Sequence, residues 1–253
     1  MAVVAGLFGC AAHKPAVEPV SGAVQNETPR DSLRVKFLLT VNNPDGTTRD
    51  LDAVLFSVPG KRYRMELTGP LGIGVASLLW KEDGWQMTFP TEKLYMKGAG
   101  YMVGLLNSDE VPLVHIHQVA DIFDGRLLPE EFETVEPLGD SVTGVLHGEG
   151  AVYAREKSGR LFTFARESFA DGSGAAKSHV AWISRPGRDG KPETIRFYDF
   201  KEFEGVETPS KIVFERDGKK ALDIRIKKIA RHKSFSSGTW RLNIPKSFKR
   251  VGG

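Results

Sequence analysis

The 253-residue chain has little that could cross-link it or carry it through a membrane. It contains one cysteine, Cys10, so neither an internal disulfide framework nor a zinc site built on cysteines can form. No run approaches the roughly 20 apolar residues that a membrane-spanning helix needs, which excludes a multi-span membrane protein. The 35 basic and 32 acidic side chains leave a net charge of +3, which suits anionic partners without requiring nucleic acid.

The sequence also lacks the residue patterns of enzymes. On a helix, His115 and His117 would point about 200° apart, so they cannot share one metal ion. The glycine-rich stretch 172–178 has alanine where a phosphate loop needs glycine before its lysine. The carboxylates of 130–133 are neighbours, as on a solvated surface, whereas a glycosidase pair faces across its substrate. No Gly-x-Ser-x-Gly nucleophile motif occurs, and we therefore predict no enzymatic activity, no metal site and no cofactor.

The first thirty residues have the pattern of an exported, lipid-anchored protein. Residues 1–9 are apolar and rich in small residues, like the end of a secretory signal peptide, and Leu7–Cys10 is close to a bacterial lipobox. We predict that Cys10 becomes the first residue of the mature protein and carries two or three acyl chains, which hold it at a membrane. Residues 10–30, rich in proline and small residues, would form a flexible tether. An unstructured N-terminus with a chance cysteine is the alternative.

Most of the remaining chain has the alternation of β-strands. Apolar and polar residues alternate from Leu33 to Val41, and glycine-containing turns separate the segments that follow. Helical spacing occurs at 110–124, with a stop at Gly125. We predict one domain over 31–253, mainly β with interior helices (α+β), in which an antiparallel curved sheet or open barrel wraps around the helical part. Strands are expected at 33–41, 49–58, 63–67, 75–80, 85–89, 141–148, 150–156, 160–168, 178–184, 193–203, 210–216, 220–230 and 238–244.

The segment Thr68–Gly74 places apolar side chains at a turn, where polar residues are expected. Pro70 restrains the backbone and Gly72 lets the chain bend sharply. Such a turn would push Leu71, together with Ile73, into solvent or lipid. A leucine that folds back onto the core is equally compatible with the sequence.

The C-terminal third of the chain is basic. Charged and apolar residues alternate within 220–230, so the basic side chains share one face of the expected strand. An ordinary solvated face explains this pattern, and attraction to anionic lipid head groups or to an acidic partner is the functional alternative. The basic residues are Lys219, Lys220, Arg225, Lys227, Lys228, Arg231, Lys233, Arg241, Lys246, Lys249 and Arg250.

Several short blocks resemble one family of bacterial proteins. Lys61–Gly72 resembles the strand and Pro-Leu-Gly loop of the lipoprotein-localisation family of LolA and LolB, in particular the outer-membrane receptor LolB. Residues 111–113 and 123–129 resemble the entry to and the exit from that family's interior helix. Residues 205–214 and 240–245 look more like the periplasmic carrier LolA.

The resemblance implies an incompletely closed antiparallel β-barrel with helices as a lid. It also implies a monomeric outer-membrane protein that is lipid-anchored and faces the periplasm. Such a protein receives acylated lipoproteins from a periplasmic LolA-like carrier and inserts them into the outer membrane without making or breaking a bond. Carried over by position, Leu71 would be the membrane-insertion residue, with Pro70, Gly72 and Ile73 around it.

Acyl chains would then be buried among apolar strand residues, although an ordinary core position is the alternative for each of them. A structural or assembly lipoprotein that holds a protein partner or another amphiphile with the same half-barrel is the second hypothesis. Nucleic acid is not an expected partner, because a lipid-anchored exported protein would rarely meet it. The predicted cavity residues are Phe37, Leu39, Leu55, Met65, Leu67, Leu79, Trp85, Met87 and Phe89.

Overall fold

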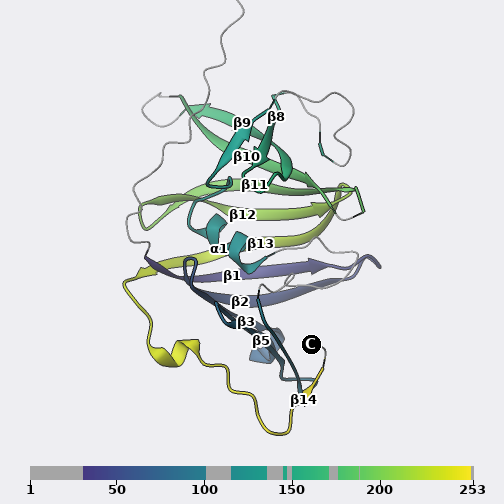
Figure 1. The fold of residues 1–253 in the computed structure, drawn as a ribbon, viewed down its shortest axis with the longest axis vertical. Helices are drawn as coiled ribbons and strands as arrows, with labels where there is room; N and C mark the ends of the chain where they lie inside the picture. Colours follow the sequence, from purple (N-terminus) through teal and green to yellow (C-terminus); the bar gives the residue numbers. More distant parts are fainter. Residues whose placement is uncertain are drawn as a thin grey trace, which may run out of the picture.

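One large curved sheet dominates the structure. It has 14 strands in the order β14-β6-β5-β4-β3-β2-β1-β13-β12-β11-β10-β9-β8-β7. The two edge strands, β14 and β7, do not pair with each other, so the sheet stays open (Figure 1). The predicted fold class is therefore confirmed. Cys10 and the expected tether lie outside the described residues, as do 110–114 and most of 141–148. The structure, a computed structural model, describes residues 31–100, 115–135, 145–146, 150–170, 176–187 and 189–251.

The elements follow each other as hairpins with one helical interruption. The helical elements are η1 (Pro70–Gly72), α1 (Ile116–Phe123) and η3 (Ser237–Trp240). The strands are β1 (Ser32–Asn42), β2 (Thr48–Val58), β3 (Arg62–Thr68), β4 (Gly74–Lys81), β5 (Gly84–Phe89), β6 (Leu94–Gly98), β7 (Phe132–Thr134), β8 (Val152–Glu156), β9 (Leu161–Ala170), β10 (Ala176–Pro186), β11 (Pro192–Phe203), β12 (Val206–Arg216), β13 (Lys219–His232) and β14 (Lys249–Arg250).

Period-two patterning decides which face of β1 is buried. In β1, Val35 and Phe37 are buried while Arg34 and Lys36 are exposed. Strand β1 pairs with β2 on one side and with β13 on the other, so two segments nearly 200 residues apart share one apolar face. The buried face lies on the concave side of the sheet, where burial of apolar surface stabilises the fold at roughly 25 cal/mol per Å².

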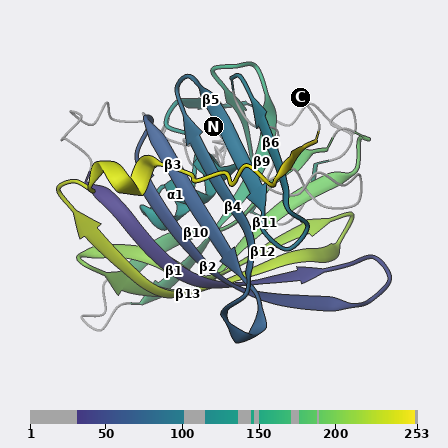
Figure 2. The ribbon, with the colours of Figure 1, turned by 90° about the horizontal axis from the view of Figure 1, so that it is seen from below.

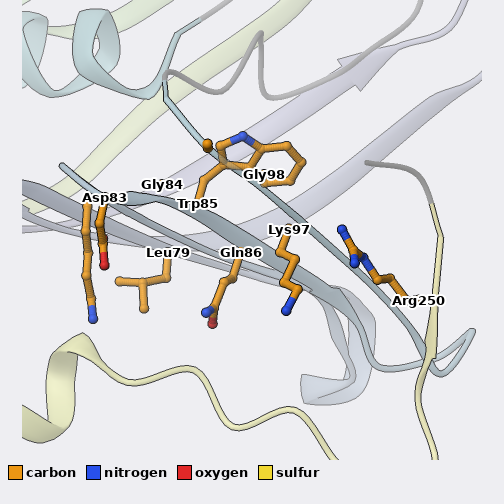
Figure 3. Close-up of a pocket in the computed structure, with 10 residues that line it drawn as sticks. Leu79, Asp83, Gly84, Trp85, Gln86, Lys97, Gly98 and Arg250 are labelled. Carbon is orange, nitrogen blue, oxygen red and sulfur yellow. The ribbon is translucent and has the colours of Figure 1, made fainter.

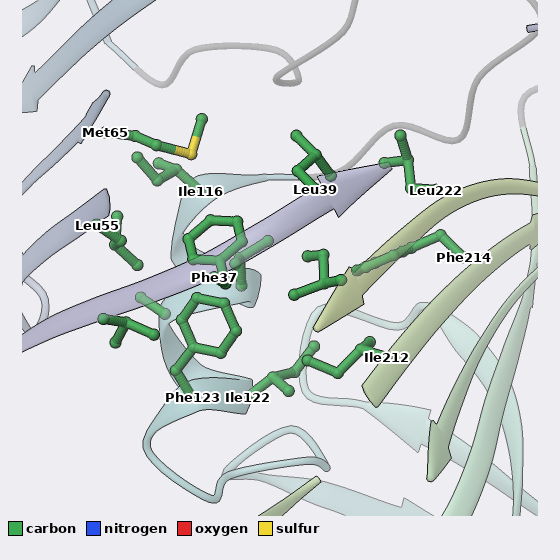
Figure 4. Close-up of a cluster of buried hydrophobic side chains, with 14 of the residues drawn as sticks. Phe37, Leu39, Leu55, Met65, Ile116, Ile122, Phe123, Ile212, Phe214 and Leu222 are labelled. Atoms are coloured by element: carbon green, nitrogen blue, oxygen red, sulfur yellow. The ribbon is translucent and has the colours of Figure 1, made fainter. Parts of the chain in front are cut away.

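Helix α1 lies on the concave side, across β12 and β13 (Figure 1). Five of its eight residues are buried, and the Phe123 ring lies 5.1 Å from that of Phe37, centroid to centroid (Figure 4). The part of the predicted helix that falls within 116–123 is confirmed. The concave side is therefore filled by side chains of this helix and of the surrounding strands.

Gly125 ends α1, as the sequence predicts. Its φ is +80°, and the Arg126 N–H donates to the Asp121 carbonyl (2.9 Å) while the Gly125 N–H donates to that of Ile122 (3.0 Å). These two bonds satisfy carbonyls that the helix end would leave without partners. A Cβ at Gly125 would also lie 2.7 Å from the Val206 side chain.

We expect Gly125→Ala to lower the free energy of unfolding by more than the roughly 1–2 kcal/mol that a left-handed conformation costs a residue with a Cβ. The matched control is Gly218→Ala, because Gly218 has a φ of +72° but open space around it. Urea unfolding of both variants separates the clash with Val206 from the backbone cost. Equal losses of unfolding free energy in the two variants would show that the Val206 side chain moves aside without an energetic cost.

The strand predicted at 238–244 is wrong. The segment forms η3 and then runs over the outer face of β3–β6 to β14, which pairs with β6 (Figure 2). The Arg64 guanidinium donates to the backbone carbonyls of Thr239 (2.8 Å) and Arg241 (3.1 Å). Hydrogen bonds from a side chain therefore hold this segment, in place of the backbone hydrogen bonds that a neighbouring strand would make. Trp240 is buried on this outer face with the Arg62 guanidinium 4.9 Å from its ring.

Strands β6, β7 and β14 were not predicted, because they are two to five residues long and show no clear alternation. Among the described residues, no helix is long and apolar enough to cross a membrane.

Candidate functional site

The loop between β3 and β4 presents an apolar tip. The Gly69 N–H donates to the Ile73 carbonyl (2.8 Å) and closes the loop around Pro70–Gly72. Leu71 has φ 61° and ψ 17°, and Gly72 follows with φ 76°. Two successive residues in the left-handed region turn the chain back so tightly that the Leu71 side chain cannot reach the core.

Leu71 is 97% exposed and Ile73 is 57% exposed. The structure therefore places both side chains in solvent, and the alternative of a leucine packed on the core is wrong. A left-handed conformation costs a residue with a Cβ roughly 1–2 kcal/mol. Backbone strain of this kind persists where the surrounding structure holds it, and it is concentrated at functional sites.

The concave side gathers most of the predicted cavity residues. Phe37, Leu39, Leu55 and Met65 (Figure 4) belong to one buried cluster together with Leu67 and Met87, and Trp85 and Phe89 pack against it half-buried. Helix α1 occupies the middle of this cluster. In this arrangement these side chains form a core, and an acyl chain would have to displace α1 to reach them.

The prediction that Leu79 lines the concave side is wrong. The register pairs Leu79 with Arg64 on β3 and Gln86 on β5, whereas Leu78 and Trp80 belong to the opposite, concave face. The cause is the uninterrupted apolar run 78–80, which has no alternation to distinguish its two faces. Leu79 instead lines an outer pocket of about 360 Å³.

Three solved structures share this architecture. A LolA superfamily protein from Nitrosomonas europaea has a TM-score of 0.50 and 12% identity, over 85% of this chain and 92% of that chain. The fold is LolA-like. A domain named for sorting outer-membrane lipoproteins, from Vibrio parahaemolyticus, has a TM-score of 0.50 and 11% identity over 85% and 90% of the two chains. A DUF1329 family protein from Desulfovibrio piger has a TM-score of 0.50 and 12% identity over 85% and 91%.

No protein-family model matches the sequence, and no curated protein matches it. At these identities the likeness establishes the LolA-like fold and nothing finer.

Polar contacts hold α1 against the LolA-like sheet on both sides. The Arg231 guanidinium on β13 donates to Asp124 (2.8 Å) just after the helix, and both side chains are largely buried. Arg185 on β10 donates to the side-chain oxygen Oε1 of Gln118 (3.3 Å), and burial lowers the pKa of Arg185. These contacts cannot be predicted from the sequence, since no spacing rule connects residues that lie 67 and 107 positions apart.

His117 packs between two aromatic rings of the sheet. Its ring centroid lies 4.5 Å from that of Tyr63 and 4.5 Å from that of Trp80. Burial, followed by the charge of His115, lowers the pKa of His117 from 6.5 to about 4. At neutral pH this contact between α1 and the sheet therefore involves an uncharged ring.

We expect acid to weaken the contact of α1 with the sheet. The folded pKa of His117, about 4, lies below its ordinary 6.5, so the unfolded chain binds more protons between these values. This contribution to the free energy of unfolding is complete above pH 6.5 and is lost as the pH falls toward 4. Urea unfolding across this range should show a smaller decline for His117→Gln than for the parent. His232→Gln, outside α1, should retain the decline, and an unchanged decline in His117→Gln would contradict the assignment.

The outer pocket lies on the convex side of β4–β6. Leu79, Gln86 and Lys97 line it from three adjacent strands, and Arg250 of β14 closes one side (Figure 3). This pocket is separated from the concave cluster by the thickness of the sheet.

The other polar candidates stay apart. Glu131 pairs with Lys157 (2.8 Å) and Glu133 with Arg155 (3.6 Å) at the surface, as in a solvated acidic run. In the described part of the chain, no three His, Cys, Asp or Glu side chains come together as a metal site would require. Residues 171–175 of the glycine-rich stretch lie outside the described residues.

Proposed function

We propose that this protein is a lipid-anchored receptor that binds the acyl chains of lipoproteins and inserts them into the outer membrane. The observation that carries the proposal is Leu71, a leucine exposed over 97% of its surface at a left-handed position in the β3–β4 loop. A leucine exposed to water contributes no burial free energy to the fold, whereas a bilayer would bury its side chain. Its place beside a LolA-like concave sheet is the arrangement that cargo delivery needs.

The concave side has the chemistry for acyl chains. Its buried cluster is aliphatic and aromatic, and each methylene removed from water contributes about 0.8 kcal/mol. When α1 is displaced, its side chains Phe123 and Ile122 become exposed to water. The apolar surface of the sheet that they covered then becomes available to the acyl chains of the cargo. In this proposal α1 acts as a lid that cargo replaces.

The anchor and the partners complete the proposal. Cys10 would carry the lipid, and residues 11–30 would tether the domain so that it faces the periplasm. A soluble LolA-like carrier would deliver the cargo to a monomeric receptor, and transfer would follow increasing affinity from the carrier to the receptor and then to the bilayer. No covalent step is required.

The filled concave side favours a second candidate function. If α1 stays in place, the sheet is a scaffold, and the protein would be an assembly lipoprotein that holds a protein partner. The two candidates differ in whether acyl chains enter the concave side.

Tryptophan emission tests the entry of acyl chains. The Cys10→Ser chain with Trp182→Phe and Trp240→Phe keeps Trp80, which touches His117 of α1, and Trp85 on the same face. A triacylated lipopeptide should change this emission saturably, because acyl chains displace the helix from Trp80. The same peptide without acyl chains is the control.

Absence of acyl-dependent binding by the folded protein would overturn the receptor proposal and support the scaffold. Circular dichroism of the same sample establishes that the protein is folded.

A further inference from the structure

The convex face of β1, β12 and β13 carries a basic surface on the side of the sheet opposite α1. Lys36 and Lys228 lie opposite each other in the β1–β13 register, and both are exposed. Arg225 on β13 lies opposite Lys211 on β12. We call Lys36, Lys211, Arg225 and Lys228 the convex basic patch.

The neighbouring carboxylates are already engaged. Lys227 binds Asp52 (2.6 Å), and Arg225 lies 3.4 Å from Asp223, which is itself buried. Asp50 accepts a hydrogen bond from the Thr40 hydroxyl. These acids therefore neutralise only part of the positive charge around them.

Positive charge remains on this face after those pairs are counted. Among the described residues, Lys36, Lys211 and Lys228 have no carboxylate within 4.0 Å. Arg34, exposed on β1 beside them, lies 5.6 Å from the Phe56 ring and likewise has no described carboxylate partner. The face is thus suited to an extended anionic surface.

The patch is aligned with the Leu71 loop. One cross-strand row on the outer face runs Thr68–Asp52–Leu38–Arg225–Lys211–Tyr198, from the base of the loop to β11. At about 4.8 Å per strand the row is roughly 24 Å long. Tyr198, at its far end, is 41% exposed, with the Lys211 ammonium 5.1 Å from its ring.

The loop and the patch face the same way. In Figure 2, β1 and β13 form the lower side of the molecule, and the loop that joins β3 to β4 extends below them. A flat surface that touches the tip of this loop therefore also approaches the outer face of β1 and β13. Tyrosine and lysine are typical of the boundary between lipid head groups and water, and leucine of the apolar layer beneath.

We propose that the convex basic patch binds the head groups of anionic phospholipids and orients the protein so that Leu71 enters the bilayer. This inference rests on the proposed function, because it describes how the receptor meets its membrane. An acidic protein would satisfy the charge but would leave the leucine tip without an apolar phase. The lipid surface accounts for the cations, the tyrosine and the leucine together.

Vesicle co-sedimentation of the full chain carrying Cys10→Ser tests the patch without the lipid anchor. Binding should be at least about 25-fold tighter to phosphatidylcholine vesicles containing one-third phosphatidylglycerol than to phosphatidylcholine alone, and high salt should remove the difference. Lys36→Gln with Lys228→Gln should weaken binding to the anionic vesicles about 25-fold, since each cation near such a surface contributes about fivefold.

Lys81→Gln with Lys97→Gln is the matched control. It removes the same charge from the outer pocket on β4 and β6, which lies away from the patch, and should weaken binding by much less. Equal weakening by the two double variants, or equal binding to both kinds of vesicle, would overturn the proposal. Lipopeptide binding is measured on the same variants, so failure of the receptor function is distinguished from failure of the membrane-orienting surface.

Discussion

Leu71→Glu is expected to lower the delivery of acylated cargo to vesicles by at least about tenfold while leaving the fold intact. Burial of a leucine side chain in an apolar phase contributes about 1.5–3 kcal/mol, and a carboxylate at the same tip opposes insertion. Because the side chain is 97% exposed, its replacement removes no contact within the protein. The measurement is transfer of a fluorescent triacylated lipopeptide from the protein to vesicles, with urea unfolding as the check on stability.

Leu71→Gly and Val251→Glu are the informative controls for this experiment. Glycine adopts the left-handed conformation without the steric cost, so Leu71→Gly should lose no stability and yet lose delivery. Val251 is also an exposed apolar side chain, but it lies at the C-terminal edge strand, where a glutamate should leave delivery unchanged. Full delivery by Leu71→Glu, or unfolding of that variant, would contradict the role of the loop.

Phe123→Ala is expected to lower the free energy of unfolding by about 3–5 kcal/mol. Phe123 is fully buried, lies at the end of α1 and packs against Phe37 on β1, so truncation leaves a cavity between the helix and the sheet. The matched control is Phe235→Ala, a half-buried phenylalanine on the outer face beside Phe56, which should cost clearly less. Urea unfolding measures both, and equal costs would show that α1 is not part of the core.

A milder change at the same position connects stability with function. Phe123→Leu should lower the free energy of unfolding by only about 1–2 kcal/mol and keep the protein folded. If α1 must leave the concave side before acyl chains enter, a weaker contact raises the population of the open state. Lipopeptide affinity should then rise in proportion. Unchanged affinity would argue that cargo does not compete with α1.

The two sets of contacts at α1 are of different kinds. Phe123 and its neighbours supply apolar burial, which acyl chains can replace directly. The Arg231–Asp124 ion pair fixes the position of α1, because it holds the C-terminal end of the helix against β13. Acyl chains cannot replace that pair, so it has to be solvated again when the helix leaves.

Much of the sheet could be predicted from local pattern. The alternation in 33–41 and 49–58 places buried and exposed residues correctly, because a strand that buries one face must repeat every second residue. The C-terminal end of α1 is likewise predicted locally, because Gly125 adopts the left-handed conformation that ends a helix. Where the pattern fails, prediction fails with it: the apolar run 78–80 gives no indication that Leu79 faces outward.

Long-range pairing lies beyond such patterns. The sequence by itself determined a mainly β domain, the helix end at Gly125 and an apolar turn at Pro70–Gly72, because each depends on neighbours in the chain. Only the tertiary structure decided that Leu71 stands in solvent, that β1 pairs with β13, and that the basic residues of both strands share one face with the Leu71 loop. Those outcomes depend on which distant segments meet, and no local periodicity encodes that choice.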